Sequence, residues 1–540
     1  MQSEAATKGA AGVVLLTLAS GQFLMTLDSS VMNVSIATVA QDLGTTVTGI
    51  QTAITLYTLV MASLMITGGK IGQIVGRKRA FGIGCVIYGC GSLVTSLAPN
   101  LTVLILGWSL LEGIGAALIM PAIVALVASN FERAERPRAY GLVASAGAIA
   151  VAAGPLIGGL FTTYLSWRLV FVAEVFIVIA ILAVGRRMAD VKPQGRVRLD
   201  LVGTALSALG LGLIVFGILR SGEWGFVRAK PSAPEWLGLS PAIWLSLAGG
   251  VVLWVFIGWE NRRLSRDQEP LVDPAILGNP QLRGGLTAFF FQYLLQAGLF
   301  FAVPLFLSVA LGLSAIATGV RLLPLSITLL VAAAGIPKVF PHASPRRVVQ
   351  LGILALFAGI VVMLVALDAD AGAEIVTWPM LLAGLGIGAL ASQLGSVTVS
   401  SVPDEEAGEV GGLQNTVTNL GASIGTALAG ALLISALTTS FLSGIQANPD
   451  VPAEVSATAT TQLAAGIPFV SDAQLRTALD DAGVPAATSD AVVKENAAAR
   501  LDGLRAALGI LALIALVGLF FTRKLPTEQP AVVAAREAPA

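Results

Sequence analysis

The chain has 540 residues, of which 55% are hydrophobic and only 12% are charged, and its mean hydropathy is +0.84. Soluble domains carry about 25% charged residues, so a water-soluble protein of this size could not cover so much apolar surface. The 32 basic and 32 acidic residues cancel, which gives no sign of a nucleic-acid partner. One histidine and two cysteines are too few for a zinc site or a disulfide framework. The composition therefore excludes a soluble enzyme and indicates an integral membrane protein.

Apolar runs of about 20 residues recur along the whole chain, and each can cross a ~30 Å hydrocarbon core as a helix. The first run is longer than the apolar core of a cleavable signal peptide, so we expect a retained helix. About fourteen membrane-spanning helices are predicted, at residues 11–35, 48–68, 79–98, 101–127, 138–162, 167–185, 199–219, 241–259, 285–311, 317–336, 347–367, 376–400, 408–437 and 503–522.

Basic residues set the expected orientation, because lysine and arginine collect in cytoplasmic loops. With the N-terminus inside, the predicted inner loops hold most of the basic residues, including the Arg77-Lys78-Arg79 triplet. The short outer loops hold only Arg168, Arg220, Arg228 and Lys230. An even number of helices then places the C-terminus in the cytoplasm as well.

Two segments depart from the alternation of helix and short loop. Residues 186–200 form a basic linker before the seventh predicted helix. Residues 438–502 form a polar stretch that is far longer than an ordinary connection, and the topology places it outside. Weak helical periodicity over 473–482 favours a small external hairpin, while the polar composition fits a disordered loop equally well.

A glycine-rich basic motif follows the second predicted helix and can form a tight turn whose basic residues face anionic lipid or a helix end. It reads Gly69-Lys-Ile-Gly72-Gln73-Ile-Val-Gly76-Arg77-Lys78-Arg79. By physics alone this is equally well a positive membrane anchor. The motif resembles the loop signature G-x-L-A-D-R-x-G-R-K of the major facilitator superfamily. Gln73 replaces the acidic residue of that signature, so the charge pairing that the resemblance implies for conformational locking lacks its acid here.

A second motif lies in the fifth predicted helix and reads Ala150-Val-Ala-Ala-Gly154-Pro155-Leu-Ile-Gly158-Gly159. Small residues recur at every fourth position and form a flat face for close helix packing, while the proline removes a backbone donor. A generic packing face explains such spacing by itself. With its G-P-x-x-G-G continuation, the motif resembles the signature of the antiporters of the same superfamily.

Further motifs resemble the fourteen-helix drug:proton antiporter branch of that superfamily. They are Leu27-Asp28-Ser-Ser-Val-Met-Asn33 in the first helix, Trp167-Arg168 before the sixth, and Gly412-Leu-Gln-Asn415-Thr in the thirteenth. The resemblance implies an all-α polytopic fold with two six-helix bundles around a central cavity. The implied parts are an N-terminal bundle (1–187), a linker with two additional helices (188–283), and a C-terminal bundle (284–540) that includes the external loop.

Three acidic residues lie at membrane depth, where ionisable groups are costly and point to function. They are Asp28, Glu112 and Glu174, and Glu112 lies about eleven residues, or ~16 Å, into its helix. The resemblance implies arginine where this chain has Ser109, glutamine at Glu112, and asparagine at Glu174. Without a nearby cation, at least one carboxyl group should hold a proton near neutral pH. The alternative for each is a neutral acid that is hydrogen-bonded to backbone or water.

Other polar side chains within the predicted helices either line a cavity or hydrogen-bond between helices. These are Gln22, Asn33, Gln51, Tyr57, Gln292, Gln296, Gln393, Gln414, Asn415 and Asn419. The ninth predicted helix is rich in phenylalanine, which suits an apolar substrate wall or ordinary packing.

The resemblance implies a secondary exporter of amphipathic or hydrophobic compounds in a bacterial cytoplasmic membrane. Multidrug efflux by proton antiport is the leading interpretation, with a monomer, no cofactor, no metal, and Asp28 and Glu112 as the proton-responsive pair. In that interpretation Glu174 assists, and a cationic substrate displaces the proton. Export or flipping of a lipid or another endogenous metabolite, without proton coupling, is the alternative, which Gln73 and Ser109 favour slightly. A membrane enzyme is disfavoured, because the sole histidine, His342, lies in a predicted loop.

Overall fold

The computed structural model describes residues 2–131, 136–186, 188, 199–229, 233–368, 371–402, 407–452 and 469–529. Most of the predicted linker at 186–200, the segment 403–406 and residues 453–468 of the predicted external loop lie outside this description. No strand occurs among the described residues, so the predicted all-helical fold is confirmed.

The first half of the chain forms nine α-helices, and a π-helical segment, η1, lies within the fourth membrane-spanning rod. The elements are α1 (Gln2–Asp42), α2 (Val47–Val75), α3 (Arg77–Ser96), α4 (Leu101–Leu104), η1 (Ile105–Glu112), α5 (Gly113–Asn130), α6 (Arg136–Tyr164), α7 (Arg168–Gly185), α8 (Leu201–Trp224) and α9 (Pro241–Leu264).

The second half continues in the same manner, with short 3-10 or π segments beside several helices. The elements are η2 (Pro274–Gly278), α10 (Pro280–Leu305), η3 (Phe306–Ala310), α11 (Ala315–Val339), α12 (Pro345–Ala366), η4 (Ala373–Val376), α13 (Thr377–Val399), α14 (Ala407–Ala447), α16 (Asp472–Asp481), α17 (Ala486–Phe521) and η5 (Thr522–Lys524).

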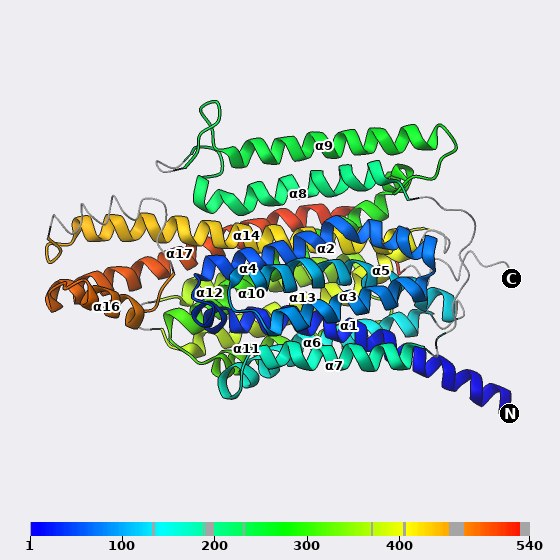
Figure 1. Ribbon diagram of the computed structural model, residues 1–540, viewed down its shortest axis with the longest axis horizontal. Coiled ribbons are helices and arrows are strands. Elements are labelled where there is room, and N and C mark those ends of the chain that lie inside the picture. Colours follow the sequence, from blue (N-terminus) through cyan, green and yellow to red (C-terminus); the bar gives the residue numbers. More distant parts are fainter. Residues whose placement is uncertain are drawn as a thin grey trace.

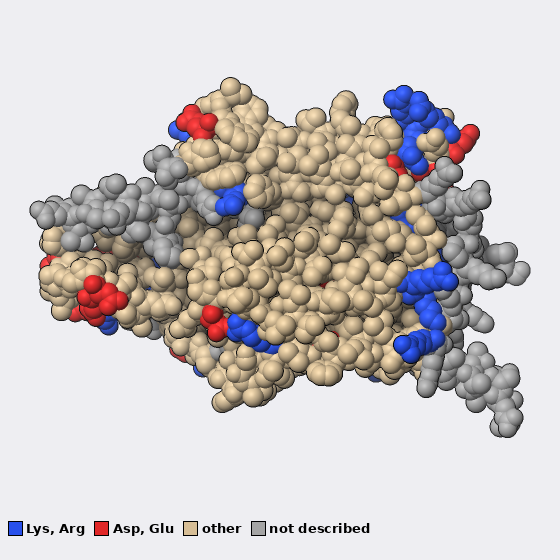
Figure 2. All heavy atoms as spheres, viewed as in Figure 1, with Lys and Arg blue, Asp and Glu red and all other residues tan. Residues whose placement is uncertain are grey.

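Among the described residues, 12 helices are long and apolar enough to cross a membrane, and α4, η1 and α5 together count as one of them. The helices α3 and α6, of 20 and 29 residues, are not among these. The predicted count of fourteen therefore stays a prediction. Figure 2 shows a broad uncharged region across the middle of the face in view. Lysine and arginine gather at one end, which we call the basic end, where α3 begins and α9 ends.

The helices form two groups that meet along two seams. The first group contains α1 to α7 and the second contains α10 to α14 with α17. The helix α2 packs along α14, and α6 packs along α11 (Figure 1). The hairpin of α8 and α9 lies outside both groups, and α8 contacts both α2 and α14. The additional helix pair therefore covers one of the two seams.

The predicted polar connection at 438–502 is wrong at both of its ends. The helix α14 continues to Ala447, and α17 begins at Ala486, well before the predicted start at 503. The start of α17 is rich in good helix formers, and the two extensions pack on each other, with Asn448 Nδ2 donating to Glu495 Oε1 at 2.8 Å. The helical periodicity near 473–482 is realised as α16. These elements project at the end of the molecule opposite the basic end, which we call the α16 end (Figure 1).

The predicted turn between Gly69 and Gly76 is also placed differently. The helix α2 runs on to Val75, seven residues beyond its predicted end, so Gly69, Gly72 and Gln73 are helical. The chain turns only at Gly76, whose φ of 102° is accessible to glycine and strained for other residues. One permissive residue is therefore enough to separate α2 from α3.

Candidate functional site

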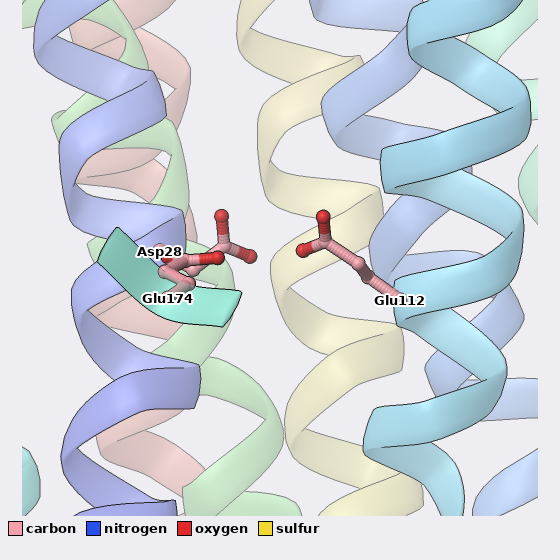
Figure 3. A group of neighbouring side chains, drawn as sticks. All are labelled: Asp28, Glu112 and Glu174. Carbon is pink, nitrogen blue, oxygen red and sulfur yellow. The ribbon is translucent and has the colours of Figure 1, made fainter. Parts of the chain in front are cut away.

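The three membrane-depth acids meet inside the first group of helices. Asp28 comes from α1, Glu112 from the last position of η1, and Glu174 from α7. One carboxylate oxygen from each acid lies within 4.8 Å of those of the other two, and the side chain of Glu112 points toward the other acids (Figure 3). Asp28 and Glu112 are 0% exposed and Glu174 is 1% exposed. We call this group the carboxyl cluster.

Each acid in the carboxyl cluster accepts hydrogen bonds from uncharged donors. Trp108 Nε1 donates to both carboxylate oxygens of Asp28 at 2.9 Å. Glu174 Oε2 accepts from Ser92 Oγ at 3.0 Å and from Tyr88 at 3.4 Å. A third hydroxyl donor of α3, Thr95 Oγ1, lies 3.2 Å from Glu112 Oε1. The oxygens Glu112 Oε2 and Glu174 Oε1 are buried without a hydrogen-bond partner.

The carboxyl cluster contains no basic group. Among the described residues, no lysine or arginine forms an ion pair with any of its three acids. Three ionised carboxylates in this apolar interior would each cost several kcal/mol in lost hydration and would repel one another. The arrangement therefore suits carboxyl groups that bind and release protons. It is also the one described group of acids whose spacing would fit a bound cation.

The π-helical segment η1 brings the fourth rod against α3. Glycines face each other across this contact, since a Cβ atom on Gly91 would lie 2.8 Å from the Gly107 carbonyl oxygen and 2.6 Å from Glu112 Cγ. Single π-helical turns inside α-helices often occur at functional sites, because they re-aim the side chains that follow. Here the segment ends at Glu112 and directs its carboxyl group into the cluster.

The predicted polar residues are distributed over several places. Tyr57 joins the carboxyl cluster, where its ring stacks on Trp108 with centroids 5.0 Å apart, and its buried hydroxyl has no hydrogen-bond partner. Gln51 lies in the seam between α2 and α14. Gln414 Oε1 accepts from Thr398 Oγ1 at 2.9 Å within the second group.

Five more of the predicted polar residues belong to the second group, and Gln22 and Asn33 lie in α1. Gln292 and Gln296 both lie in α10, where Gln292 is buried with an unpartnered Oε1 atom. The Asn415 carbonyl accepts from Asn419 Nδ2 at 2.8 Å in α14. Gln393 Oε1 in α13 accepts from Gln529 Nε2 at 2.9 Å. These residues do not meet the carboxyl cluster.

A small cavity lies between the two groups of helices. Its wall is formed by three residues of α1 and by residues of α10 and α11: Ser30, Asn33, Val34, Phe300, Pro304, Leu322, Leu325 and Ser326. None of these eight side chains is charged, and none belongs to the carboxyl cluster. The expected displacement of a proton by a cationic substrate at the carboxyl groups stays a prediction. We call this space the intergroup cavity.

The glycines of the fifth-helix motif lie directly against α1. A Cβ atom on Gly154 would collide with the side chain of Ser30, and one on Gly158 would lie 3.0 Å from Val31 Cα. The predicted close helix approach is thus present between α6 and α1. Gly159 is buried in the same helix, and the side chain of Pro155 lies outside the described part of the chain.

The basic motif near Gly76 binds backbone carbonyls at neighbouring helix ends. Arg77 Nη1 donates to the Ala125 carbonyl near the end of α5 at 3.0 Å, and Lys78 Nζ donates to that of Arg186 at 2.9 Å. Basic groups are favourable at helix C-termini, because the carbonyls there carry partial negative charge. Gly69, Gly72 and Gln73 line a small hollow between α2 and α5.

Sequence reasoning missed four donors of the carboxyl cluster: Trp108, Tyr88, Ser92 and Thr95. The last three recur at spacings of four and three residues on α3, so they form a polar stripe on one face of an apolar helix. Trp108 precedes Glu112 by four residues along its helix. A search for polar stripes inside apolar helices would have found these residues.

Comparisons with known proteins agree with this architecture. A family model described as Major Facilitator Superfamily matches residues 18–426. The puromycin resistance protein of Streptomyces alboniger is 31% identical, and the match covers 77% of this chain and 80% of that protein. A probable actinorhodin transporter of Streptomyces coelicolor is 30% identical, with 85% and 76% covered.

Two further matches extend over almost the whole chain. The multidrug efflux pump LfrA of Mycolicibacterium smegmatis is 26% identical, with 95% of this chain and 97% of the pump covered. A solved bacterial homolog of the human lysosomal transporter Spinster, inward-facing and unoccupied, superimposes with a TM-score of 0.59 at 15% identity, covering 98% and 99% of the two chains. This last likeness concerns the fold alone.

Proposed function

This chain belongs to the Major Facilitator Superfamily, and from that membership we propose that it exports small, largely apolar compounds across the membrane of its cell in exchange for protons. The chemically different antibiotics in the names of its relatives support a broad range of cargo. The intergroup cavity has room for about one water molecule in this structure, and its uncharged lining supports a cargo of low charge once the two groups of helices move apart.

The observation that carries the proton coupling is the carboxyl cluster itself. Three buried acids with no basic partner can bind protons at one side of the membrane and release them at the other, when helix movement changes their surroundings. Asp28 and Glu112 form the responsive pair in this proposal, and Glu174 of α7 joins the cluster to α3 through Tyr88 and Ser92. The basic end of the molecule faces the cytoplasm in this proposal, and we expect both termini on the same side.

The test is transport in proteoliposomes with an imposed pH gradient and a panel of dyes, drugs and lipids, while proton flux is recorded in parallel. We expect Asp28→Asn and Glu112→Gln to lower pH-driven export about tenfold or more, because neither side chain can then exchange a proton. Glu260→Gln is the matched control, because Glu260 is an equally buried acid of α9 outside the cluster.

Wild-type transport and wild-type pH dependence in both neutral variants would overturn the proton assignment. If the same variants then moved lipid across the bilayer, export of a lipid without proton coupling would become the better interpretation. Loss of transport in Glu260→Gln as well would indicate a general sensitivity to buried acids rather than a role of the cluster.

A further inference from the structure

The indole of Trp108 joins the carboxyl cluster to the neighbouring helix α2. Its Nε1 atom lies 2.9 Å from both carboxylate oxygens of Asp28, and its ring is almost parallel to that of Tyr57, with an interplanar angle of 5°. Trp108 is among the largest fully buried side chains. The indole has one donor and no acceptor, so its position is fixed by an oxygen that accepts.

The segment η1 that carries Trp108 contacts three helices through three nearby side chains. Trp108 donates to Asp28 of α1, and Ser109 Oγ donates to the Ala53 carbonyl of α2 at 2.8 Å. One turn later, Glu112 accepts from Thr95 of α3. Because each of these hydrogen bonds ties η1 to a different helix, the loss of one changes how η1 packs against all three.

We propose that Trp108 is a positioning residue that transmits the protonation of Asp28 to the packing of η1 against α1 and α2. This inference rests on the proton coupling proposed above. An ionised carboxylate accepts the indole N–H through either of its oxygens, whereas a protonated one offers a weaker acceptor, so protonation loosens the contact of α1 with η1. Ser30 and Asn33 lie on α1 shortly after Asp28 and line the intergroup cavity, so a shift of α1 reaches the cargo without contact between cargo and carboxyl group.

Among the described groups around Asp28, the indole of Trp108 is the one suited to transmit the protonation state of this carboxylate. The titratable groups near Asp28 are Tyr57 of α2, Tyr88 of α3, Glu112 of η1 and Glu174 of α7, whereas the indole of Trp108 does not titrate. The helices α5, α6, α10 and α11 also contact α1, and none of their described groups is among those that act on Asp28. Among the described residues, the Trp108 indole is therefore the rigid side-chain donor that hydrogen-bonds to the Asp28 carboxylate.

The test is the pH profile of transport in Trp108→Phe, which keeps an aromatic ring and removes the donor. Because the ionised carboxylate loses its donor, we expect the pH of half-maximal transport to move upward by about one unit. Trp167→Phe is the matched control, because Trp167 Nε1 also donates to an aspartate of α1, Asp42 Oδ2, at 2.9 Å, but at the other end of the helix. Its profile should match that of the wild type.

The outcomes separate this inference from the proposed function. A wild-type profile that does not depend on pH would overturn the proton coupling and this inference with it. A pH-dependent wild type with an unchanged Trp108→Phe profile would overturn only the role of Trp108. So would an equal shift in Trp167→Phe.

A second measurement covers the case in which Trp108→Phe does not fold. Tryptophan fluorescence of purified protein is titrated with pH in a variant that retains Trp108 and has phenylalanine at the other seven tryptophan positions, with and without Asp28→Asn. We expect a fluorescence transition that disappears when residue 28 cannot titrate. The same transition in both proteins would contradict the inference.

Discussion

The side-chain amide of Gln51 donates to the backbone carbonyl of Thr426 at 3.0 Å and thereby joins α2 of the first group of helices to α14 of the second. Both residues are close to the α16 end of the seam. Gly430 makes the approach possible, because a Cβ atom there would collide with the Gln51 side chain. An alternating-access transporter must break this contact each time that end opens.

We therefore expect Gln51→Ala and Gly430→Ala to favour the state that is open at the α16 end. One buried hydrogen bond contributes about 1 kcal/mol, which corresponds to about a fivefold shift in the ratio of the two states. Spin labels on the two helix ends would measure the change in distance. Since both variants remove the same contact, the double variant should be no more open than either single one. Gly509→Ala is the control, because open space surrounds that position.

The close contact of α6 with α1 predicts that a large side chain at Gly158 stops transport. A leucine there would meet Val31 and overpack the interface by about 1–3 kcal/mol or more. Export should be lost while the protein still inserts in the membrane, as judged by surface labelling. Gly335→Leu on α11 has no neighbour within 4 Å and should retain activity. Full activity in Gly158→Leu would mean that the small-residue face has no mechanical role.

The proposed orientation predicts which engineered cysteines react with an impermeant thiol reagent. In a background without Cys85 and Cys90, a cysteine at the exposed Thr477 of α16 should react from outside the cell. A cysteine at the exposed Gln268, near the basic end, should react only after the membrane is opened. The same contrast is expected between segments 438–502 and 188–198. The reverse pattern would overturn the orientation.

The buried Arg500 predicts a stability difference within the projecting helices. Its guanidinium donates to Asp472 Oδ1 at 2.6 Å and to the Val470 carbonyl at 2.8 Å, and the side chain is 3% exposed. Arg500→Ala breaks the ion pair with Asp472 and leaves the Val470 carbonyl with only the longer, 3.5 Å contact from Asn496 Nδ2. We therefore expect a loss of about 1–3 kcal/mol of unfolding free energy. Arg476→Ala breaks an exposed pair with Asp490 and should cost at most about 1 kcal/mol. Equal thermal shifts for both variants would contradict this expectation.

Much of the fold follows from apolar periodicity, because a chain that crosses a bilayer must satisfy its backbone hydrogen bonds within each segment. The residues at which helices begin and end are predicted less well by this periodicity. The polar residues Lys70 and Gln73 end the apolar run of α2, but the helix continues to Val75. It ends at Gly76, whose backbone conformation is strained for residues other than glycine. Hydropathy also misses the alanine-rich start of α17, since helix formation there depends on packing rather than on lipid.

The acids of the site could be predicted from the sequence, but the side chains that donate hydrogen bonds to them could not. Asp28, Glu112 and Glu174 are conspicuous because a charge at membrane depth is costly. That they meet, and that Trp108 lies between Asp28 and Tyr57, depends on how α1, η1 and α7 pack against one another. Asp28 and Trp108 are 80 residues apart in the chain, and a contact between segments so distant produces no periodic pattern in either sequence.

The length of α14 has a mechanical consequence. Its 41 residues make one continuous rod of about 60 Å, twice the thickness of the hydrocarbon core. Where it crosses α10 the contact is backbone on backbone, because a Cβ atom on Gly421 or Gly425 would meet carbonyls of that helix. A rod held tightly at such a fulcrum acts as a lever, so a tilt of about 10° moves its tip, ~30 Å away, by about 5 Å. A small tilt of α14 within the membrane would therefore produce a larger displacement of its projecting tip in water, where a probe can detect it.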